Sequence, residues 1–338
     1  MKRNKVLVGM SGGVDSSVCA YILQKQGYEV TGLTLNVLGC KDSNCDDAKK
    51  ICDRLGIKHV VLNLKEEFDE KIIKYFVDEY IKGRTPNPCV MCNREFKFEK
   101  MLQKADELGI KYVATGHYVK IKNINGRHIL QKAKDGKKDQ SYVLYRLSQE
   151  QLSRCIFPLG NYTKKEIRDI AKELGFENAN KSDSQDICFV EDGNYSSLIH
   201  PKDNIKGDIV DVDGNVIGEH NGIYNYTIGQ RKGIKISSNK PLYVVGIDKE
   251  KNRVIVGDKD KLFSKSLVAK DINWIDIPKN RMLVTARIRY HSKEALAIIE
   301  QKDDSVLVKF FRSQRAITPG QSVVFYKGKN LLGGGVIQ

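Results

Sequence analysis

The sequence predicts an α/β protein in which a parallel-sheet domain is followed by a small central β domain and a C-terminal β-barrel, and three patterns support this. Up to about residue 118, short apolar runs typical of buried strands alternate with helical patterns, and strands joined through helices form parallel sheets. After about residue 193 the helical pattern stops, and strands separated by glycine turns take over. From about residue 263, roughly five or six short strands in one small domain are typical of a barrel. We expect the domains to span residues 1–195, 205–262 and 263–338.

Each element has its own local signal. In the first domain, short apolar runs predict strands at 6–10, 29–35, 59–64 and 112–115. Apolar residues at helical spacing, most of them followed by a C-capping glycine, predict helices at 16–26, 45–55, 67–81, 93–108 and 164–174. Glycine-containing turns predict hairpins at 118–134 (around Asn125-Gly126) and 207–218, and 242–256 is expected to be a second strand pair. Barrel strands are expected at 283–290, 295–300, 306–311, 323–326 and 331–337.

The stretch that joins the first strand to the first helix predicts an anion site. Gly12 and Gly13 let the backbone turn sharply, and the N-terminus of the next helix points at the same place. Ser11, Ser16 and Ser17 add hydroxyl donors. The lysine that precedes Ser/Thr in the phosphate loops of kinases and GTPases is missing, which argues against γ-phosphoryl transfer.

The rim of the sheet brings three stretches together. Ligands of parallel sheets bind beyond the carboxyl ends of the strands, and residues 9–16, Leu35 and 115–117 all lie there. The sequence therefore predicts a nucleotide pocket at this rim.

A second chemical signal is the C-x-x-C spacing of Cys89 and Cys92. Because Pro86 and Pro88 lie just before them, we expect residues 82–94 to form a rigid exposed loop. Arg84 and Arg94, together with the N-terminus of the next helix, would lower the thiol pKa. The pair could be redox-active, half of a zinc site, ligands of an iron–sulfur cluster, or two structural cysteines. Cys188 lies in a polar segment that we expect to be another loop.

The composition indicates which class of partner the protein binds and in which cellular compartment it is expected. The net charge is +15, with 57 Lys and Arg against 42 Asp and Glu, which favours a polyanionic partner. The segment 221–233 mixes aromatic and basic residues and suits nucleic acid. No apolar run of about 18 residues and no charged-then-apolar leader is present, so we expect a cytosolic protein that does not enter a membrane. Its eight cysteines should then be mostly reduced.

Seven motifs occur in the order found in a known family. They are SGGVDS within 9–16, NPCVMCN, TGHY at 115–118, DQSY at 139–142, SQDICFV at 184–190, YTIGQRKG at 226–233 and RYHS at 289–292. Together they resemble the tRNA-specific 2-thiouridylases, and the first also resembles the pyrophosphate loop of ATP pyrophosphatases, which adenylate a substrate. The resemblance implies an ATP-pyrophosphatase-type sheet domain. It also implies ATP-dependent replacement of the C2 oxygen of the wobble uridine, U34, by sulfur in lysine, glutamate and glutamine tRNAs.

The resemblance also implies roles for individual positions. ATP, with Mg²⁺ to offset its charge, would be held by Gly9, Met10, Ser11, Gly12, Gly13, Val14, Asp15, Ser16, Leu35 and Gly116. The target base and the rest of the tRNA would be contacted by Asn87, Pro88, Cys89, His117, Lys138, Asp139, Gln140, Arg289, Tyr290 and Gln321. Cys92 matches the nucleophile and Cys188 the persulfide carrier, which implies a sulfur donor such as a cysteine desulfurase or a sulfur carrier protein.

One position departs from the usual pattern of the family. Many members carry Asp where this chain has Cys89. Cys89, Cys92 and Cys188 together resemble the three cysteines with which related tRNA thiolases hold a [4Fe–4S] cluster. The alternative is a persulfide on Cys188 that Cys92 attacks. Two other classes compete with the whole interpretation, namely another tRNA-adenylating enzyme and a non-catalytic tRNA-binding protein.

Overall fold

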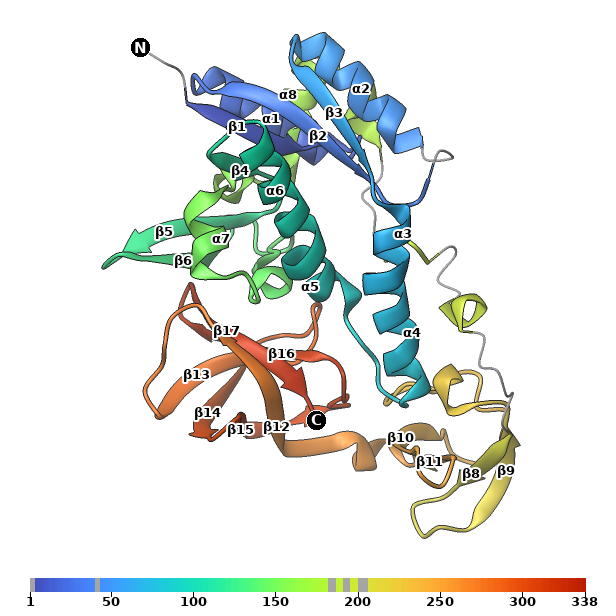
Figure 1. Ribbon diagram of the computed structural model, residues 1–338. Coiled ribbons are helices and arrows are strands. Elements are labelled where there is room, and N and C mark those ends of the chain that lie inside the picture. Colours follow the sequence, from blue (N-terminus) through green and yellow to red (C-terminus); the bar gives the residue numbers. More distant parts are fainter. Residues whose placement is uncertain (1–3, 40–42, 182–186, 191–194, 200–205) are drawn as a thin grey trace. The chain divides into compact units, whose positions relative to one another are not determined.

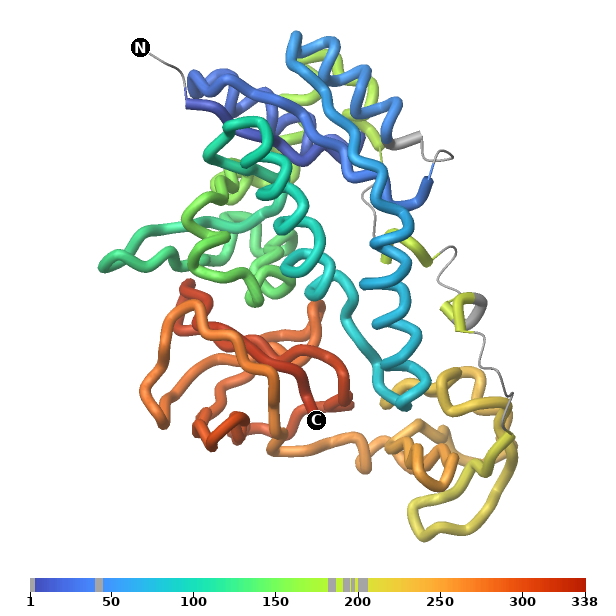
Figure 2. Tube along the Cα trace, in the orientation of Figure 1, coloured from blue at the N-terminus to red at the C-terminus, as the bar shows by residue number. Residues whose placement is uncertain are grey.

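The computed structural model describes residues 4–39, 43–181, 187–190, 195–199 and 206–338, and its ribbon is shown in Figure 1. The chain forms two compact units. The first unit contains Met1–Ile72, Cys89–Phe189 and Gly328–Leu332, and the second contains Ile73–Pro88, Val190–Lys327 and Gly333–Gln338. Figure 2 traces the backbone through the points at which the chain passes from one unit to the other. Because this division does not separate the central domain from the barrel, the three boundaries expected from the sequence stay a prediction.

The first unit is built on a parallel sheet, as predicted. Its strands are β1 (Lys5–Gly9), β2 (Glu29–Asn36), β3 (Lys58–Asn63), β4 (Tyr112–Ala114) and β7 (Cys155–Ile156), in the order β3-β2-β1-β4-β7. Every pair is parallel. The chain first adds strands on one side of β1 and later adds β4 on the other side. The end of β1 is therefore the switch point at which ligands of such sheets bind.

Helices cover both faces of this sheet. On one face, Val6 and Val8 of β1 share a core with α1 (Val14–Lys25), α2 (Ser43–Leu55) and α8 (Lys164–Glu173). Residues of a strand alternate between faces, and a Cβ built on Gly9 would lie 3.3 Å from the side chain of Met101 in α6 (Glu99–Glu107). The opposite face of β1 thus packs against α6.

The segment between β3 and β4 differs from the prediction. The helix expected at 67–81 is α3 (Lys65–Phe68) and α4 (Lys74–Ile81), with π-helical residues Asp69–Ile73 between them. The predicted loop at 82–94 is wrong in its second half. There, α5 (Pro88–Cys92) leads through π-helical residues Asn93–Phe98 into α6. Proline is well suited to the first position of a helix, where its missing N–H would have no partner, so Pro88 starts this helix instead of preventing it.

The remaining elements of the first unit follow the sequence signals closely. β5 (Val119–Ile124) and β6 (Arg127–Lys132) form the predicted hairpin, and Asn125 and Gly126 have the positive φ values, 50° and 79°, of its turn. α7 (Gln149–Arg154) precedes β7, and neither was predicted. The side chain of Thr163 caps α8 by accepting from the backbone N of Glu166. Residues 182–186 of the loop expected before Cys188 lie outside the described residues.

The second unit contains two all-β parts. β8 (Gly207–Val210), β9 (Val216–His220), β10 (Tyr243–Asp248) and β11 (Arg253–Gly257) form a sheet in the order β10-β11-β8-β9, which includes the predicted hairpin and the predicted strand pair. The six-stranded barrel has the order β12-β15-β14-β13-β16-β17, and pairing of β12 with β17 closes it. Its strands are β12 (Phe263–Trp274), β13 (Arg281–Arg287), β14 (Ala295–Lys302), β15 (Ser305–Arg315), β16 (Ser322–Lys327) and β17 (Asn330–Ile337). The barrel was predicted, but β12 was not among its expected strands. Within the described ranges, no helix has the length and apolar character needed to cross a membrane.

The close packing of Gly160 gives a test of the first unit. A Cβ at this position would lie 2.1 Å from the carbonyl oxygen of Val119, which is backbone and cannot easily move. We expect Gly160→Ala to lower the free energy of unfolding by about 2 kcal/mol or more, as overpacking does. The control is Gly136→Ala, because nothing lies within 4 Å of a Cβ there, and its effect should stay within about 0.5 kcal/mol. Urea unfolding measures both, and equal stability of the two variants would contradict the packing.

Candidate active site

The turn after β1 leaves the N-terminus of α1 without a side-chain cap. Gly12 has φ of 70°, in the left-handed region that glycine adopts without strain. Gly13 occupies the N-cap position and has no side chain with which to accept from the first N–H groups of α1. These N–H groups and the positive end of the helix dipole therefore face the carboxyl end of the central strand. This arrangement suits a phosphate group.

Hydrogen bonds within the turn fix its shape. The hydroxyls of Ser16 and Ser17 each donate to the carbonyl oxygen of Gly13 at 3.0 Å, and the backbone N of Ser11 donates to Ser16 Oγ at 3.2 Å. Asn178 donates from Nδ2 to the carbonyl oxygen of Gly12 and to Ser17 Oγ, both at 2.9 Å. The serine hydroxyls, expected as donors to a ligand, thus hold the turn in its phosphate-accepting form. Asn178 carries no motif that sequence reasoning could use.

Asp15, the next residue of α1, is held by two side chains from distant parts of the first unit. Its carboxylate accepts from Lys164 Nζ at 2.8 and 2.7 Å and from the hydroxyl of Tyr118 at 2.7 Å. Lys164 is buried at the start of α8, whereas the side chain of Asp15 is 32% exposed, so water reaches the pair from the side of Asp15. Sequence reasoning found Lys164 only as the first residue of a helix, because nothing local indicates a partner 149 positions away.

The structure brings Gly116 to the same turn and joins the turn to β2, the strand that contains Leu35. A Cβ on Gly116 would lie 2.9 Å from the carbonyl carbon of Asp15 and 3.0 Å from the N of Ser16, so no side chain fits between them. Met10 donates its backbone N–H to Leu33 and accepts at its carbonyl from Thr34 Oγ1, which ties the turn to β2, the strand of Leu35. Met10 and Val14 are buried, so the ligand would meet their backbone.

Asn178, which bonds to the turn, also lines a cavity of about 460 Å³. It is lined by Asp47, Lys50, Ile51, Arg54, Glu177, Asn178 and Lys181. Within the described residues, the buried Oδ1 of Asn178 has no hydrogen-bond partner. Lys50 and Lys181 are paired with Glu177 and Asp47 of the same lining, and an amide oxygen can only accept, so the cavity itself is not built for phosphate. The features that suit the phosphates of a nucleotide are the uncapped N-terminus of α1 and the glycine turn before it.

Cys89 and Cys92 lie three residues apart in α5, so both thiols are on one face of the helix. Cys89 and Cys188 are exposed, and Cys92 is partly buried. Although Cys89 is exposed as a whole residue, many protein atoms surround its thiol, and this desolvation raises its pKa. Desolvation also raises the pKa of Cys92 to about 11. Charge on Cys188 raises the pKa of both other thiols as well. The three predicted cysteines are therefore close enough to interact electrostatically.

The expected lowering of the thiol pKa values is wrong, because desolvation outweighs the neighbouring positive charge. The cation that lowers the pKa of Cys89 and Cys92 is Lys97, one turn further along the same helical segment. Arg84, which sequence reasoning favoured, is instead paired with Glu79 at 2.8 Å in the second unit. Lys97 was missed because the spacing of a π-helical turn is not visible in the sequence.

The three cysteines do not form a ready metal site. Among the residues that the structure describes, no group of three or more His, Cys, Asp or Glu side chains has the arrangement of a metal-binding set. The donor set thus does not fit a cluster as it stands.

The residues expected to contact tRNA are divided between the two units. In the first unit, Asp139 is buried and accepts from the backbone N of Ala133 and from Ser141 Oγ, and Gln140 Oε1 accepts from the backbone N of Tyr118. Burial, and then the charge of Lys97, lowers the pKa of His117 to about 3. His117 is therefore a neutral ring at physiological pH, and Asp139 and Gln140 hold the backbone around it.

In the second unit, the expected contacts are Asn87, Pro88, Arg289, Tyr290 and Gln321. Arg289 donates from Nη2 to the carbonyl oxygens of Ile228 (3.1 Å) and Ala316 (2.9 Å) and to Thr318 Oγ1 (2.5 Å). Gln321 donates from Nε2 to the carbonyl oxygens of Thr85 (2.9 Å) and Pro86 (3.3 Å). The polar groups of Arg289 and Gln321 thus donate to acceptors within the second unit.

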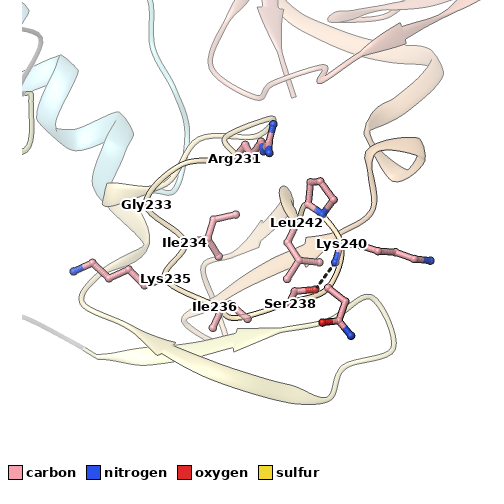
Figure 3. Close-up of a pocket in the computed structure, with 10 residues that line it drawn as sticks. Arg231, Gly233, Ile234, Lys235, Ile236, Ser238, Lys240 and Leu242 are labelled. Atoms are coloured by element: carbon pink, nitrogen blue, oxygen red, sulfur yellow. Dashed lines mark hydrogen bonds between the residues drawn. The ribbon is translucent and has the colours of Figure 1, made fainter.

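The aromatic and basic segment at 221–233 leads into a hollow of about 370 Å³ in the second unit. Figure 3 shows that residues 231–242 encircle this hollow, with Ile234 and Leu242 inside. The side chains of Lys235 and Lys240 extend away from it on opposite sides. The loop therefore presents separated positive charges outward instead of a closed anion pocket.

Comparison with known proteins gives matches along nearly the whole chain. Residues 4–192 match the family model described as tRNA methyl transferase HUP domain, residues 198–258 the tRNA methyl transferase PRC-barrel domain, and residues 264–337 the aminomethyltransferase beta-barrel domain.

Several curated proteins are similar to this chain over their full length. The tRNA-specific 2-thiouridylase MnmA 1 of Caldanaerobacter subterraneus subsp. tengcongensis is 52% identical, covering 99% of this chain and 98% of its own. The tRNA-specific 2-thiouridylase MnmA of Halothermothrix orenii is 50% identical, covering 99% of each chain. That of Acetivibrio thermocellus is also 50% identical and covers 100% of each. Together with the geometry above, these matches show that the chain belongs to the family of tRNA-specific 2-thiouridylases.

Proposed function

We propose that this protein uses ATP to replace the C2 oxygen of the wobble uridine of tRNA with sulfur. The observation that supports this most directly is that one unit contains both an uncapped helix N-terminus suited to phosphate and three thiols that interact with one another. The matching family models are described by methyl transfer, but a methyltransferase has no need of this pair of features. The curated relatives are named for thiolation, which agrees with both.

The first half of the proposed reaction activates the base. The C2 oxygen of a pyrimidine is a poor leaving group, and transfer of AMP to it releases pyrophosphate and makes it a good one. The N–H groups at the start of α1 would bind the phosphates, and Mg²⁺, when bound with the nucleotide, offsets their charge. Lys164 binds Asp15 and so fixes the position of α8 against α1 at this site.

The second half delivers sulfur from a persulfide on Cys188. The terminal sulfur attacks C2, the C2–O bond breaks and AMP leaves. The thiolate of Cys92 then attacks the Cys188 sulfur, so that the bond to the product sulfur breaks and a Cys92–Cys188 disulfide forms. An external thiol reduces this disulfide, and a cysteine desulfurase or a sulfur carrier protein restores the persulfide. Because the three thiols do not form a ready ligand set, no step of the proposed reaction uses an iron–sulfur cluster.

The test of the proposed function is to incubate the protein with a lysine, glutamate or glutamine tRNA transcript, ATP, Mg²⁺ and a persulfide donor, and to analyse the nucleosides by mass spectrometry. Thiolation predicts the mass of 2-thiouridine at the wobble position and release of AMP and pyrophosphate. A methylated nucleoside, or tRNA binding without either product, would overturn the proposal.

The ion pair at the nucleotide turn provides a matched test. We expect Lys164→Met to slow tRNA-dependent pyrophosphate release at least about ten-fold, because a positioned group is lost. It should also lower the free energy of unfolding by about 2 kcal/mol, because Asp15 loses a charged donor. Lys165→Met, at the exposed neighbouring position, should leave both unchanged. Wild-type pyrophosphate release by Lys164→Met would remove this pair from the site.

Cys89 separates the two sulfur routes. In the persulfide route Cys92 and Cys188 are indispensable and Cys89 is not, so we expect Cys89→Ala to retain thiolation and Cys92→Ala to lose it. Thiolation and iron content are measured together on protein purified without oxygen, before and after cluster reconstitution. If Cys89→Ala loses both iron and sulfide-dependent thiolation, the cluster route is correct.

The neutral state of His117 makes stability depend on pH. Its folded pKa of about 3 lies below the ordinary value of 6.5, so the unfolded chain binds the extra proton and the folded state loses stability as the pH falls below 6.5. Between pH 7 and pH 5 the wild type should lose about 1 to 2 kcal/mol more than His117→Asn does. Urea unfolding at both pH values measures this, with His291→Asn as the control at an exposed histidine. Parallel losses in wild type and His117→Asn would show that His117 is protonated normally.

A further inference from the structure

The chain just before the cysteine helix is held by the barrel of the second unit. Thr85 donates its backbone N–H to the carbonyl oxygen of Pro319 at 2.9 Å. Gln321 donates from Nε2 to the carbonyl oxygens of Thr85 and Pro86, at 2.9 and 3.3 Å. Both N–H groups of the Gln321 amide are therefore used on two consecutive peptide groups. All these residues belong to the same unit, so the contacts are internal to it.

Gly320 packs tightly against the chain at Arg84 and Thr85. Gly320 has φ of 89°, and a Cβ there would lie 3.0 Å from the N of Thr85 and 3.1 Å from Arg84 Cβ. Arg84 also donates from Nη2 to the carbonyl oxygen of Ile337 at 3.4 Å. The backbone of residues 84–86 thus lies directly against the turn that carries Gln321.

Arg289 holds the same turn from the other side. Its three acceptors belong to Ile228, Ala316 and Thr318, so it joins the 316–321 turn to the segment that begins at Thr227. Thr227 in turn contacts Thr85, with the two hydroxyl oxygens 3.3 Å apart. The segments 85–86, 227–228 and 316–321 therefore form one closed set of contacts, which we call the lead-in brace.

From these contacts we infer that Gln321 is a positioning residue: it fixes the main chain of Thr85 and Pro86 and so sets where Asn87 and Pro88 lie on the barrel. Pro86 and Pro88 restrict the backbone between the brace and the start of α5, so an error in the brace is carried to Asn87 instead of being absorbed. This inference rests on the proposed function together with the family resemblance, which implies that Asn87 and Pro88 contact the target base. It assigns Gln321 to the rate of the reaction more than to the affinity for tRNA.

The experiment compares Gln321→Met, which keeps the size of the side chain and removes the donors, with Gln314→Met as the matched control. Gln314 lies on the same barrel, and among the described residues its side chain donates to the nearby carbonyl oxygen of Arg312. For Gln321→Met we expect a tRNA Kd within about twofold of wild type with an unchanged salt dependence. At saturating tRNA, kcat for pyrophosphate release and thiolation should fall about ten- to hundred-fold, as small misplacements near a reacting group do. Gln314→Met should change neither.

A direct contact between Gln321 and tRNA predicts that Gln321→Met changes the Kd for tRNA and not kcat. The Kd would then rise and kcat at saturating tRNA would stay at the wild-type value, and this result would overturn the inference. Unchanged Kd together with unchanged kcat would overturn it as well. Gln321→Lys supplies new N–H donors to the same two carbonyl oxygens, so it should restore part of kcat if the brace is what matters.

Hydrogen exchange provides a readout that needs no activity. The amide of Thr85, bonded to Pro319, should exchange faster in Gln321→Met than in wild type and should be unchanged in Gln314→Met. This result would support the brace even if the protein thiolated no tRNA, so failure of the inference and failure of the proposed function remain distinguishable. Equal exchange of the Thr85 amide in all three proteins would show that Gln321 does not hold the segment.

Discussion

The structure of the first unit depends on an N-terminus of α1 to which no side chain among the described residues provides a cap. A buried parallel sheet normally satisfies its polar groups, and a helix that starts against it normally has a side-chain cap. Here glycine occupies the cap position, and the nearby serine hydroxyls are turned onto the Gly13 carbonyl instead. Asn178, Lys164 and Tyr118 hold the turn from outside. The N–H groups at this N-terminus are thus rigidly placed before any ligand arrives, which reduces the entropy cost of binding phosphate.

At the thiols, desolvation and charge act in opposite directions, and desolvation is larger. The pKa of Cys92 is raised to about 11 although Lys97 lowers it. A thiol in this state is largely protonated at neutral pH and reacts slowly. The proposed reaction brings a polyanionic nucleotide and an RNA to the same unit, and it needs the Cys92 thiolate only after sulfur has been transferred. A protonated resting thiol is therefore compatible with the chemistry, and it protects a partly exposed cysteine from oxidation.

Most of the architecture could be predicted because it follows local rules. The spacing of apolar residues, the glycines that cap helices and the Asn-Gly turn at 125–126 depend only on neighbouring residues. The parallel sheet, the hairpins and the barrel that they predict are all present in the structure. The predictions that are wrong concern residues whose local sequence is compatible with two different structures. Pro88 both breaks and starts helices, and only the packing of the following segment decides between them. Lys164, Asn178 and Lys97 could not be found because their partners are either far away in the sequence or reached through a π-helical turn.

The same reasoning changes how the basic residues of the second unit are understood. A sequence with net charge +15 leads one to count each arginine of a barrel as a contact for nucleic acid. Yet the guanidinium of Arg289 donates to three acceptors of its own unit, and Arg287 lies 3.7 Å from Glu294. Moving Arg289 onto a phosphate would break its bonds to the carbonyl oxygens of Ile228 and Ala316. The Ala316 oxygen would keep Thr318 Oγ1 as a donor, and the loss offsets part of the gain. The side chains of Lys235 and Lys240 extend outward from their loop (Figure 3), and outward cations of this kind are suited to long-range attraction of a polyanion. Arg287 and Arg289 are thus held by acceptors of their own unit, whereas Lys235 and Lys240 extend away from their loop.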